Sequence, residues 1–422
     1  MLLGVTLLFG NTSWAQSPPR SYLEEGLMQN YPPSGNLKVD KNNWLTTPYN
    51  RYAFQHVSET HFSKILSRGA GKIGILNEGV RQLEGVTFED HKGDTQSLRE
   101  FIEASYTDAI IVIHDGKIIL ENYYNEQEAT TQHIVFSITK SLLGTMVSKK
   151  IAEGVLNADD PLTAYIPELE KSGYASVTIQ QLMDMTASID YSENYLNPYS
   201  EIYRHMIAAS YLPKPDNYDG PESIHEFIHG LRRDGKHGQR FSYISVNSEV
   251  LAWVVARATC RSMEDLFEEE IWQKIGAERD AYIISDGQGM ASWSGGISVT
   301  ARDLARFGLM MLRDGRFNAN QCIPSSVVKD ITQPEDLVFE KQLGKSVTKI
   351  PPVSYKNHWW FTNSPNKAYY AEGIYGQYLY IDPVANMVIV KQSSYHVPVN
   401  SNFKYDTMAA FARLGELLSN PN

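Results

Sequence analysis

Residues 136–140 are Phe136-Ser137-Ile138-Thr139-Lys140, a Ser-x-x-Lys sequence at the start of an apolar run with helical spacing. Residues three apart lie on one face of a helix, so the Lys140 amine can reach the Ser137 hydroxyl. A helix start also favours a developing alkoxide and offers the Ser137 N–H to an oxyanion. The pattern predicts a serine nucleophile with a lysine base, although an ordinary solvated helix start can have the same sequence.

The patterns on either side of this sequence predict an α+β fold. Two β-rich runs in residues 109–124 flank Asp115-Gly116, a strong hairpin signal, and a second hairpin is expected around Asp382-Pro383. Together they predict an antiparallel sheet flanked by helices, with an adjoining, mostly helical region at about 160–290. Helices are expected at Phe136–Ala152, Ser248–Ala258, Met263–Ile275, Ala301–Arg313 and about Asp406–Leu418.

The N-terminal sequence predicts export. A short apolar run followed by small residues is typical of a signal peptide over residues 1–15, with cleavage after Ala15, although a buried strand is the other interpretation. We therefore expect a periplasmic or secreted protein. Residues 16–105 are interpreted as an N-terminal extension wrapped on a hydrolase domain over residues 106–420.

Tyr243 is the second candidate for proton transfer. It lies in the sequence Phe241-Ser242-Tyr243-Ile244-Ser245, just before an apolar helix. A phenol in such a turn can pass a proton between a serine, a lysine and a leaving group. A partly buried aromatic residue at a helix start is the plain alternative, since the chain has 25 tyrosines.

These motifs, in this order, resemble the serine β-lactamase-like superfamily, which includes class C β-lactamases and penicillin-binding proteins, and in particular the 6-aminohexanoate-dimer hydrolases. The resemblance also rests on the stretches Asp190–Tyr195, Trp293–Gly308, Trp359-Trp360 and Gly373–Pro383. It implies a β-lactamase/transpeptidase-like fold. It implies too that the Ser137 and Ile374 N–H groups bind the oxyanion.

The resemblance implies several substrate-binding residues as well. Tyr195 is similar to a mobile tyrosine that closes over the substrate, and Trp360 to a wall of the acyl pocket. Ser294 stands in the pocket where relatives have another polar residue. Tyr375 replaces the usual lysine or histidine, and Met206 stands where the dimer hydrolases have an acidic residue. Binding of a charged substrate is therefore expected to be weaker than in these relatives.

The sequence thus predicts a serine hydrolase that cleaves small carboxyl esters or linear amides through an acyl-enzyme on Ser137, with Lys140 and Tyr243 in proton transfer. One alternative is a D-Ala-D-Ala carboxypeptidase or β-lactamase, and another is a non-catalytic binding protein on the same scaffold. The sequence His225-Glu226-Phe227-Ile228-His229 matches the zinc-protease motif, with Glu249 as a candidate third ligand. Gly230 follows His229 at once, and the sequence does not extend into a longer zinc-binding motif. The zinc-protease alternative is therefore disfavoured.

The composition and net charge limit the kinds of binding partner expected for this protein. The net charge is -11 and no basic block stands out, which disfavours nucleic acid and anionic membranes. No stable membrane anchor, metal or cofactor is predicted. The two cysteines, Cys260 and Cys322, could pair in an oxidising compartment or stay separate, and the oligomeric state is open.

Overall fold

The computed structural model describes residues 19–79, 81, 83, 85–318, 320–332, 338–339 and 353–419. The predicted signal segment therefore lies outside the described residues.

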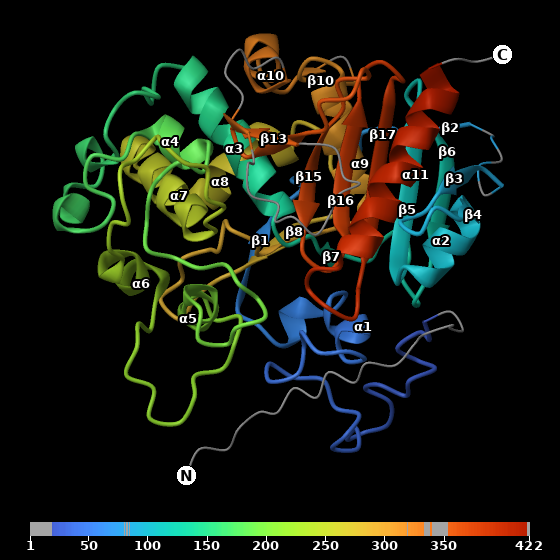
Figure 1. The fold of residues 1–422 in the computed structure, drawn as a ribbon, viewed down its shortest axis with the longest axis horizontal. Helices are drawn as coiled ribbons and strands as arrows, with labels where there is room; N and C mark the ends of the chain where they lie inside the picture. Colours follow the sequence, from blue (N-terminus) through green and yellow to red (C-terminus); the bar gives the residue numbers. More distant parts are fainter. Residues whose placement is uncertain are drawn as a thin grey trace.

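A nine-stranded sheet forms the centre of the fold (Figure 1). All of its neighbouring strands are antiparallel except β2 (Asn77–Glu78) and β6 (Lys117–Tyr123), which pair in parallel. An earlier and a later part of the chain meet where β5 (Thr107–His114) pairs with β17 (Met387–Ser393). The strands, in spatial order, are β12 (Val338–Phe339), β13 (Ser354–Lys356), β14 (Trp359–Phe361), β15 (Tyr369–Gly373), β16 (Gln377–Asp382), β17 (Met387–Ser393), β5 (Thr107–His114), β6 (Lys117–Tyr123) and β2 (Asn77–Glu78).

Both predicted hairpins are present. Strands β5 and β6 are joined by Asp115 and Gly116, whose φ angles of 49° and 74° suit a two-residue turn of the primed type. Strands β16 and β17 pair around the turn that begins at Asp382.

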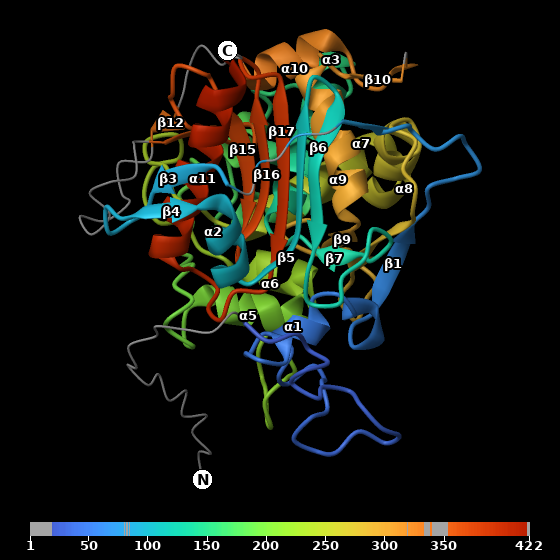
Figure 2. The same cartoon turned by 90° about the vertical axis from the view of Figure 1, so that its right-hand side faces the viewer.

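Helices cover both faces of this sheet, as Figure 2 shows. Helix α11 (Ser401–Ser419) and α2 (Leu98–Ala104) lie on one face, and α9 (Ala301–Leu312) and α3 (Ile138–Ala152) lie on the other. A Cβ atom at Gly308 would lie 2.6 Å from Val388, so a glycine lets α9 pack closely against β17.

The helical region lies beside the sheet in Figure 1. Here α7 (Val246–Thr259) is buried along most of its length, and α8 (Met263–Phe267) continues into a π-helical turn at Glu268–Trp272. A four-stranded sheet with the order β1-β8-β9-β7 borders this region. The remaining elements are α4 (Ile179–Met183), α5 (Glu201–Ala208), α6 (Ile224–Gly230), α10 (Ser325–Thr332), β1 (Ser63–Leu66), β8 (Ala281–Ile284), β9 (Ile297–Val299), β7 (His133–Ile134), the hairpins β3 (Thr87–Glu89) with β4 (Thr95–Ser97) and β10 (Arg316–Phe317) with β11 (Asn320–Gln321), and the 3-10 turns Val57–Glu59, Leu162–Ala164 and Pro167–Lys171.

The segment interpreted as an extension takes part in the four-stranded sheet through β1 and in the nine-stranded sheet through β2. Its short helix α1 (Asn50–Ala53) is followed by Phe54, which is fully buried together with Trp44. The extension thus contributes to the core of the fold. The division near residue 105 stays a prediction.

Helix α11 begins five residues earlier than expected. The side chain of Asn400 accepts hydrogen bonds from the N–H groups of Asn402 and Phe403, each at 3.1 Å. This cap fixes the helix start ahead of the first strongly apolar turn.

Candidate active site

Ser137 lies where a short strand turns into a helix. Strand β7 ends at Ile134 and α3 begins at Ile138. Between them Phe136 has a φ of 43°, a left-handed conformation that costs a non-glycine residue about 1–3 kcal/mol. Tertiary packing holds it there, because the Phe136 ring contacts those of Phe54 and Trp44 at centroid distances of 5.0 and 6.1 Å. The extension therefore supports the residue next to Ser137.

Lys140 lies one turn along α3, and its side chain points back to Ser137. Its Nζ donates to Ser137 Oγ at 2.8 Å and to the Ser294 carbonyl at 2.5 Å. Only 1% of the residue is exposed. Burial lowers the pKa of Lys140 to about 8, while the charges of Glu193 and Glu249 act in the opposite direction.

Tyr243 and Trp360 form an aromatic wall beside this pair. Lys140 Nζ lies 5.1 Å from the centre of the Tyr243 ring. That ring stacks on Trp360 at 5.8 Å with an interplanar angle of 18°. The structure thus brings Tyr243, from the loop before α7, to the lysine, and Trp360, from β14, packs against the Tyr243 ring.

Ile374 follows β15 and lines the site next to Ser137. A Cβ atom on the preceding Gly373 would lie 2.3 Å from the Val135 carbonyl oxygen. A glycine is therefore required for the end of β15 to approach the segment that carries Ser137.

Glu193 is a half-buried acceptor that the sequence analysis did not single out. It accepts hydrogen bonds from the Ser245 N–H and hydroxyl at 2.9 and 2.7 Å, and from the Tyr195 hydroxyl at 2.9 Å. It thereby joins the Tyr195 loop to the turn after Tyr243. The residue lies within the stretch Asp190–Tyr195, but only the distant contact with Ser245 reveals its role.

Glu249 was considered only as a zinc ligand, and the structure gives it other partners. Its fully buried carboxylate accepts hydrogen bonds from the N–H groups of Trp293 and Ser294, at 2.8 and 3.2 Å, and from the Ser292 hydroxyl at 2.7 Å. It therefore holds the segment whose Ser294 carbonyl accepts from Lys140. His205 Nε2 lies 3.6 Å from the same carboxylate.

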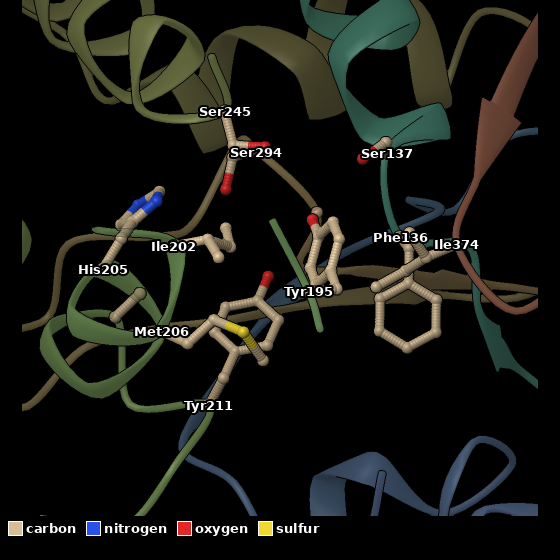
Figure 3. Close-up of a pocket in the computed structure, with 12 residues that line it drawn as sticks. Phe136, Ser137, Tyr195, Ile202, His205, Met206, Tyr211, Ser245, Ser294 and Ile374 are labelled. Atoms are coloured by element: carbon tan, nitrogen blue, oxygen red, sulfur yellow. The ribbon is translucent and has the colours of Figure 1, made fainter. Parts of the chain in front are cut away.

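Two cavities meet at Ser137, Tyr195 and Ile374. The smaller, of about 40 Å³, is drawn in Figure 3, where Ile202, His205 and Met206 lie across from Ser137 and Ile374. Ser294 also lines it. The larger, of about 380 Å³, is lined by residues that include Glu193, Tyr243, Trp360, Glu372 and Lys404.

Tyr375 does not lie with the other predicted substrate-binding residues. The residue has a φ of 61°, and its side chain is buried against Phe54 and Phe136. Its hydroxyl donates to the Leu45 carbonyl at 3.0 Å. The left-handed turn directs the phenol away from both cavities and into the core, so the prediction that Tyr375 contacts the substrate is wrong.

His225 and His229 both lie on α6, and their rings pack against Trp253 at 4.3 and 5.9 Å. Among the described residues, no group of three or more His, Cys, Asp or Glu side chains could hold a metal ion. Cys260 is exposed, Cys322 is buried, and both are free thiols. No helix in the described ranges is long and apolar enough to span a bilayer.

Comparison with known proteins places this site in a family. The β-lactamase family model matches residues 98–412, so the chain belongs to the β-lactamase family. The match agrees with the sheet, the helical region and the Ser137–Lys140 geometry. It confirms the predicted fold class and, at the coarse level, a hydrolase of this family.

Two relatives show similarity to a narrower group within this family. The chain is 33% identical to the 6-aminohexanoate-dimer hydrolase of Paenarthrobacter ureafaciens, over 87% of this chain and 91% of that one. A solved structure of a candidate 6-aminohexanoate-dimer hydrolase from Bacillus anthracis superimposes with a TM-score of 0.82 at 30% identity, covering 92% of this chain and 99% of that chain. These findings confirm the resemblance to that family.

A third structure shares the fold alone. It is EstCE1, described as a hydrolase with promiscuous acyltransferase activity, with a TM-score of 0.57 at 14% identity over 76% of this chain and 96% of that one.

Proposed function

We propose that this protein is a serine hydrolase that cleaves small carboxyl esters and linear amides through an acyl-enzyme on Ser137. The observation that carries the proposal is the buried Lys140 amine, 2.8 Å from Ser137 Oγ, where two cavities meet. A serine needs a nearby base to become nucleophilic at neutral pH, and a lysine acts as one when burial lowers its pKa.

In the first step Ser137 Oγ attacks the substrate carbonyl carbon, and its proton passes to neutral Lys140. With a pKa of about 8, a useful fraction of Lys140 is neutral near pH 7. The carbonyl oxygen becomes an oxyanion, which accepts hydrogen bonds from the N–H groups of Ser137 and Ile374. A pair of such donors contributes several kcal/mol, or about 3 kcal/mol each, to stabilising the transition state.

The leaving group then takes a proton as its bond to the carbonyl carbon breaks. Tyr243 is suited to deliver it and to take back from Lys140 the proton that came from Ser137, because its ring lies 5.1 Å from Lys140 Nζ and it lines the larger cavity. Water next attacks the acyl-enzyme, gives up a proton through the same groups, and releases the acid while Ser137 recovers its proton.

The two cavities support a division between the acyl and leaving groups. One water needs about 10–15 Å³, so the smaller cavity of about 40 Å³ has room for roughly three water-sized groups. That suits a short acyl chain. The larger cavity then receives the alcohol or amine.

Esters should react faster than amides because an alcohol leaves readily, whereas an amine must be protonated in place. Tyr195 lines both cavities and is held by Glu193, so it can position an amide. The relatives named above support amide hydrolysis as a second capability.

The test is labelling with a fluorophosphonate, followed by mapping of the modified residue. We expect a single adduct on Ser137. A panel of p-nitrophenyl acetate and butyrate, the 6-aminohexanoate dimer, nitrocefin and a D-Ala-D-Ala peptide should then give the highest kcat/KM for the esters. An adduct elsewhere, or β-lactam turnover above that of the esters, would contradict the proposal.

A further inference from the structure

The larger cavity contains a cation that the sequence analysis did not single out. Lys404 lies in the first turn of α11 and lines this cavity together with Ser137. Its Nζ is 2.7 Å from Glu372 Oε2 and 5.7 Å from the centre of the Trp360 ring. The side chains of Lys404 and Glu372 are 17% and 20% exposed, so both are anchored yet remain accessible from the cavity.

Lys404 has donors to spare. An ammonium group has three N–H donors, and the Glu372 carboxylate engages one of them. Glu372 in turn accepts from the Tyr378 hydroxyl at 3.2 Å. A second carboxylate can therefore bind Lys404 without the existing ion pair breaking.

Among the described residues that line this cavity, Lys404 is the only cation. The other charged residues are Glu193 and Glu372. Glu193 is already engaged by three donors, from Tyr195 and Ser245. An anionic substrate group in this cavity would thus find one favourable partner, Lys404, on the α11 side.

Lys404 also lies close to the reacting centre. Glu372 is the second-last residue of β15 and Ile374 follows the end of that strand, so their Cα atoms are at most about 7 Å apart at roughly 3.3 Å per residue, and both residues line the larger cavity. A substrate whose carboxylate binds Lys404, beside Glu372, can therefore place its carbonyl next to Ser137 and Ile374 with only a short spacer between the two groups.

We propose that Lys404 is a specificity-determining residue that binds a carboxylate on the leaving group of the substrate. This inference rests on the proposed function and narrows its substrate class to acyl esters and amides of short hydroxy acids and amino acids. The cation comes from α11, not from position 375, where a buried phenol takes the place of a lysine.

The experiment uses butyryl esters of hydroxy acids with spacers of one to five methylene groups, each compared with its neutral carboxamide. The measurement is the ratio of kcat/KM for the carboxylate to that for the carboxamide. For the wild-type protein we expect a ratio of about ten at a short optimum spacer, the usual scale of one charge-assisted hydrogen bond. It should fall as salt is added.

Lys404→Met and Glu372→Gln should move this ratio in opposite directions. Lys404→Met should bring it to one or below, and Lys404→Arg should retain most of it. Glu372→Gln should raise it, because the negative charge beside Lys404, which repels a second carboxylate, is gone. Lys117→Met, which removes an exposed lysine on β6 outside the cavity, should leave it unchanged.

A ratio near one at every spacer length, or one that Lys404→Met and Glu372→Gln do not move, would overturn the inference while the proposed function stands. If Lys404→Met does not fold, Glu372→Gln and Lys404→Arg decide the matter. Hydrolysis of the series by Ser137→Ala would instead overturn the proposed function itself.

Discussion

Among the described residues, two buried lysines each contact a serine and a tyrosine. In the first group, Lys140 lies between Ser137 and the Tyr243 ring. In the second, on β17, Lys391 donates to Ser393 and lies 4.8 Å from the centre of the Tyr395 ring. Burial lowers the pKa of both lysines, to about 8 for Lys140 and about 7 for Lys391.

The difference lies in access and in backbone geometry. Ser137 is half-buried at a helix start and lines two cavities, whereas Ser393 is fully buried in a strand. A substrate carbonyl can reach only the first serine, beside the end of β15. A lowered lysine pKa is therefore not enough to mark an active site, and an open position for the reacting atom is also needed.

The largest expected effect separates the two serines. Ser137→Ala should lower kcat/KM for p-nitrophenyl butyrate by roughly a thousandfold or more, since the acyl-enzyme cannot form. Ser393→Ala is the matched control and should keep near-native rates. Circular dichroism checks that both variants fold. Equal losses of kcat/KM in the two variants would contradict the distinction between the Lys140 group and the Lys391 group.

The next largest effect concerns the proton-transfer groups of the first site. Lys140→Ala and Tyr243→Phe should each lower kcat by about a hundredfold, the usual scale for a lost acid or base. The double variant should lose little more than either single one, because the groups act as a unit. If the loss in the double variant equals the product of the two single losses, measured under the same conditions, the two residues have independent roles.

The first group was largely predictable from the sequence because its core is local. Ser137 and Lys140 are three residues apart, and helix geometry alone brings them together. The hairpin around Asp115-Gly116 followed from turn chemistry in the same way. Tyr243 and Ile374 come from distant segments, and only the order of motifs typical of the superfamily indicated them.

The remaining features depend on contacts that no local pattern encodes. Glu249 is 45 residues from Ser294, yet it accepts the Ser294 N–H. The direction of the Tyr375 side chain was missed because it depends on a left-handed turn and on packing against Phe54. Lys404 reaches the cavity only because α11 folds back over the sheet.

A smaller effect tests the electrostatics of Lys140. If Lys140 acts as the base, kcat/KM should rise with pH through a midpoint near 8. The charge of Glu249 favours protonated Lys140, so Glu249→Gln should move the midpoint to lower pH. Glu270→Gln, in a carboxylate that pairs with Lys149 and Lys150, is the control and should not move it. An upward shift for Glu249→Gln would contradict the assignment.

The smallest effect on activity is expected for Lys391→Met, which should leave kcat/KM unchanged but alter how stability depends on pH. Lys391 has a pKa of about 7 in the folded protein against 10.5 as its ordinary value, so between these limits the unfolded chain binds more protons. The free energy of unfolding of the wild-type protein therefore gains up to about 1.4 kcal/mol per pH unit from this residue as pH rises from about 7 to about 10.

Methionine cannot titrate, so the variant should lack this contribution. Urea unfolding at several pH values within that window measures the difference in unfolding free energy between wild type and variant. This difference should shift in favour of the wild type as pH rises. Lys140→Met should show the same trend over a narrower window, because its folded pKa is closer to 10.5. Parallel curves for Lys391→Met would mean that Lys391 stays charged in the folded state. The two lysines would then differ in ionisation as well as in access, and the lowered pKa of Lys140 would itself distinguish the active site.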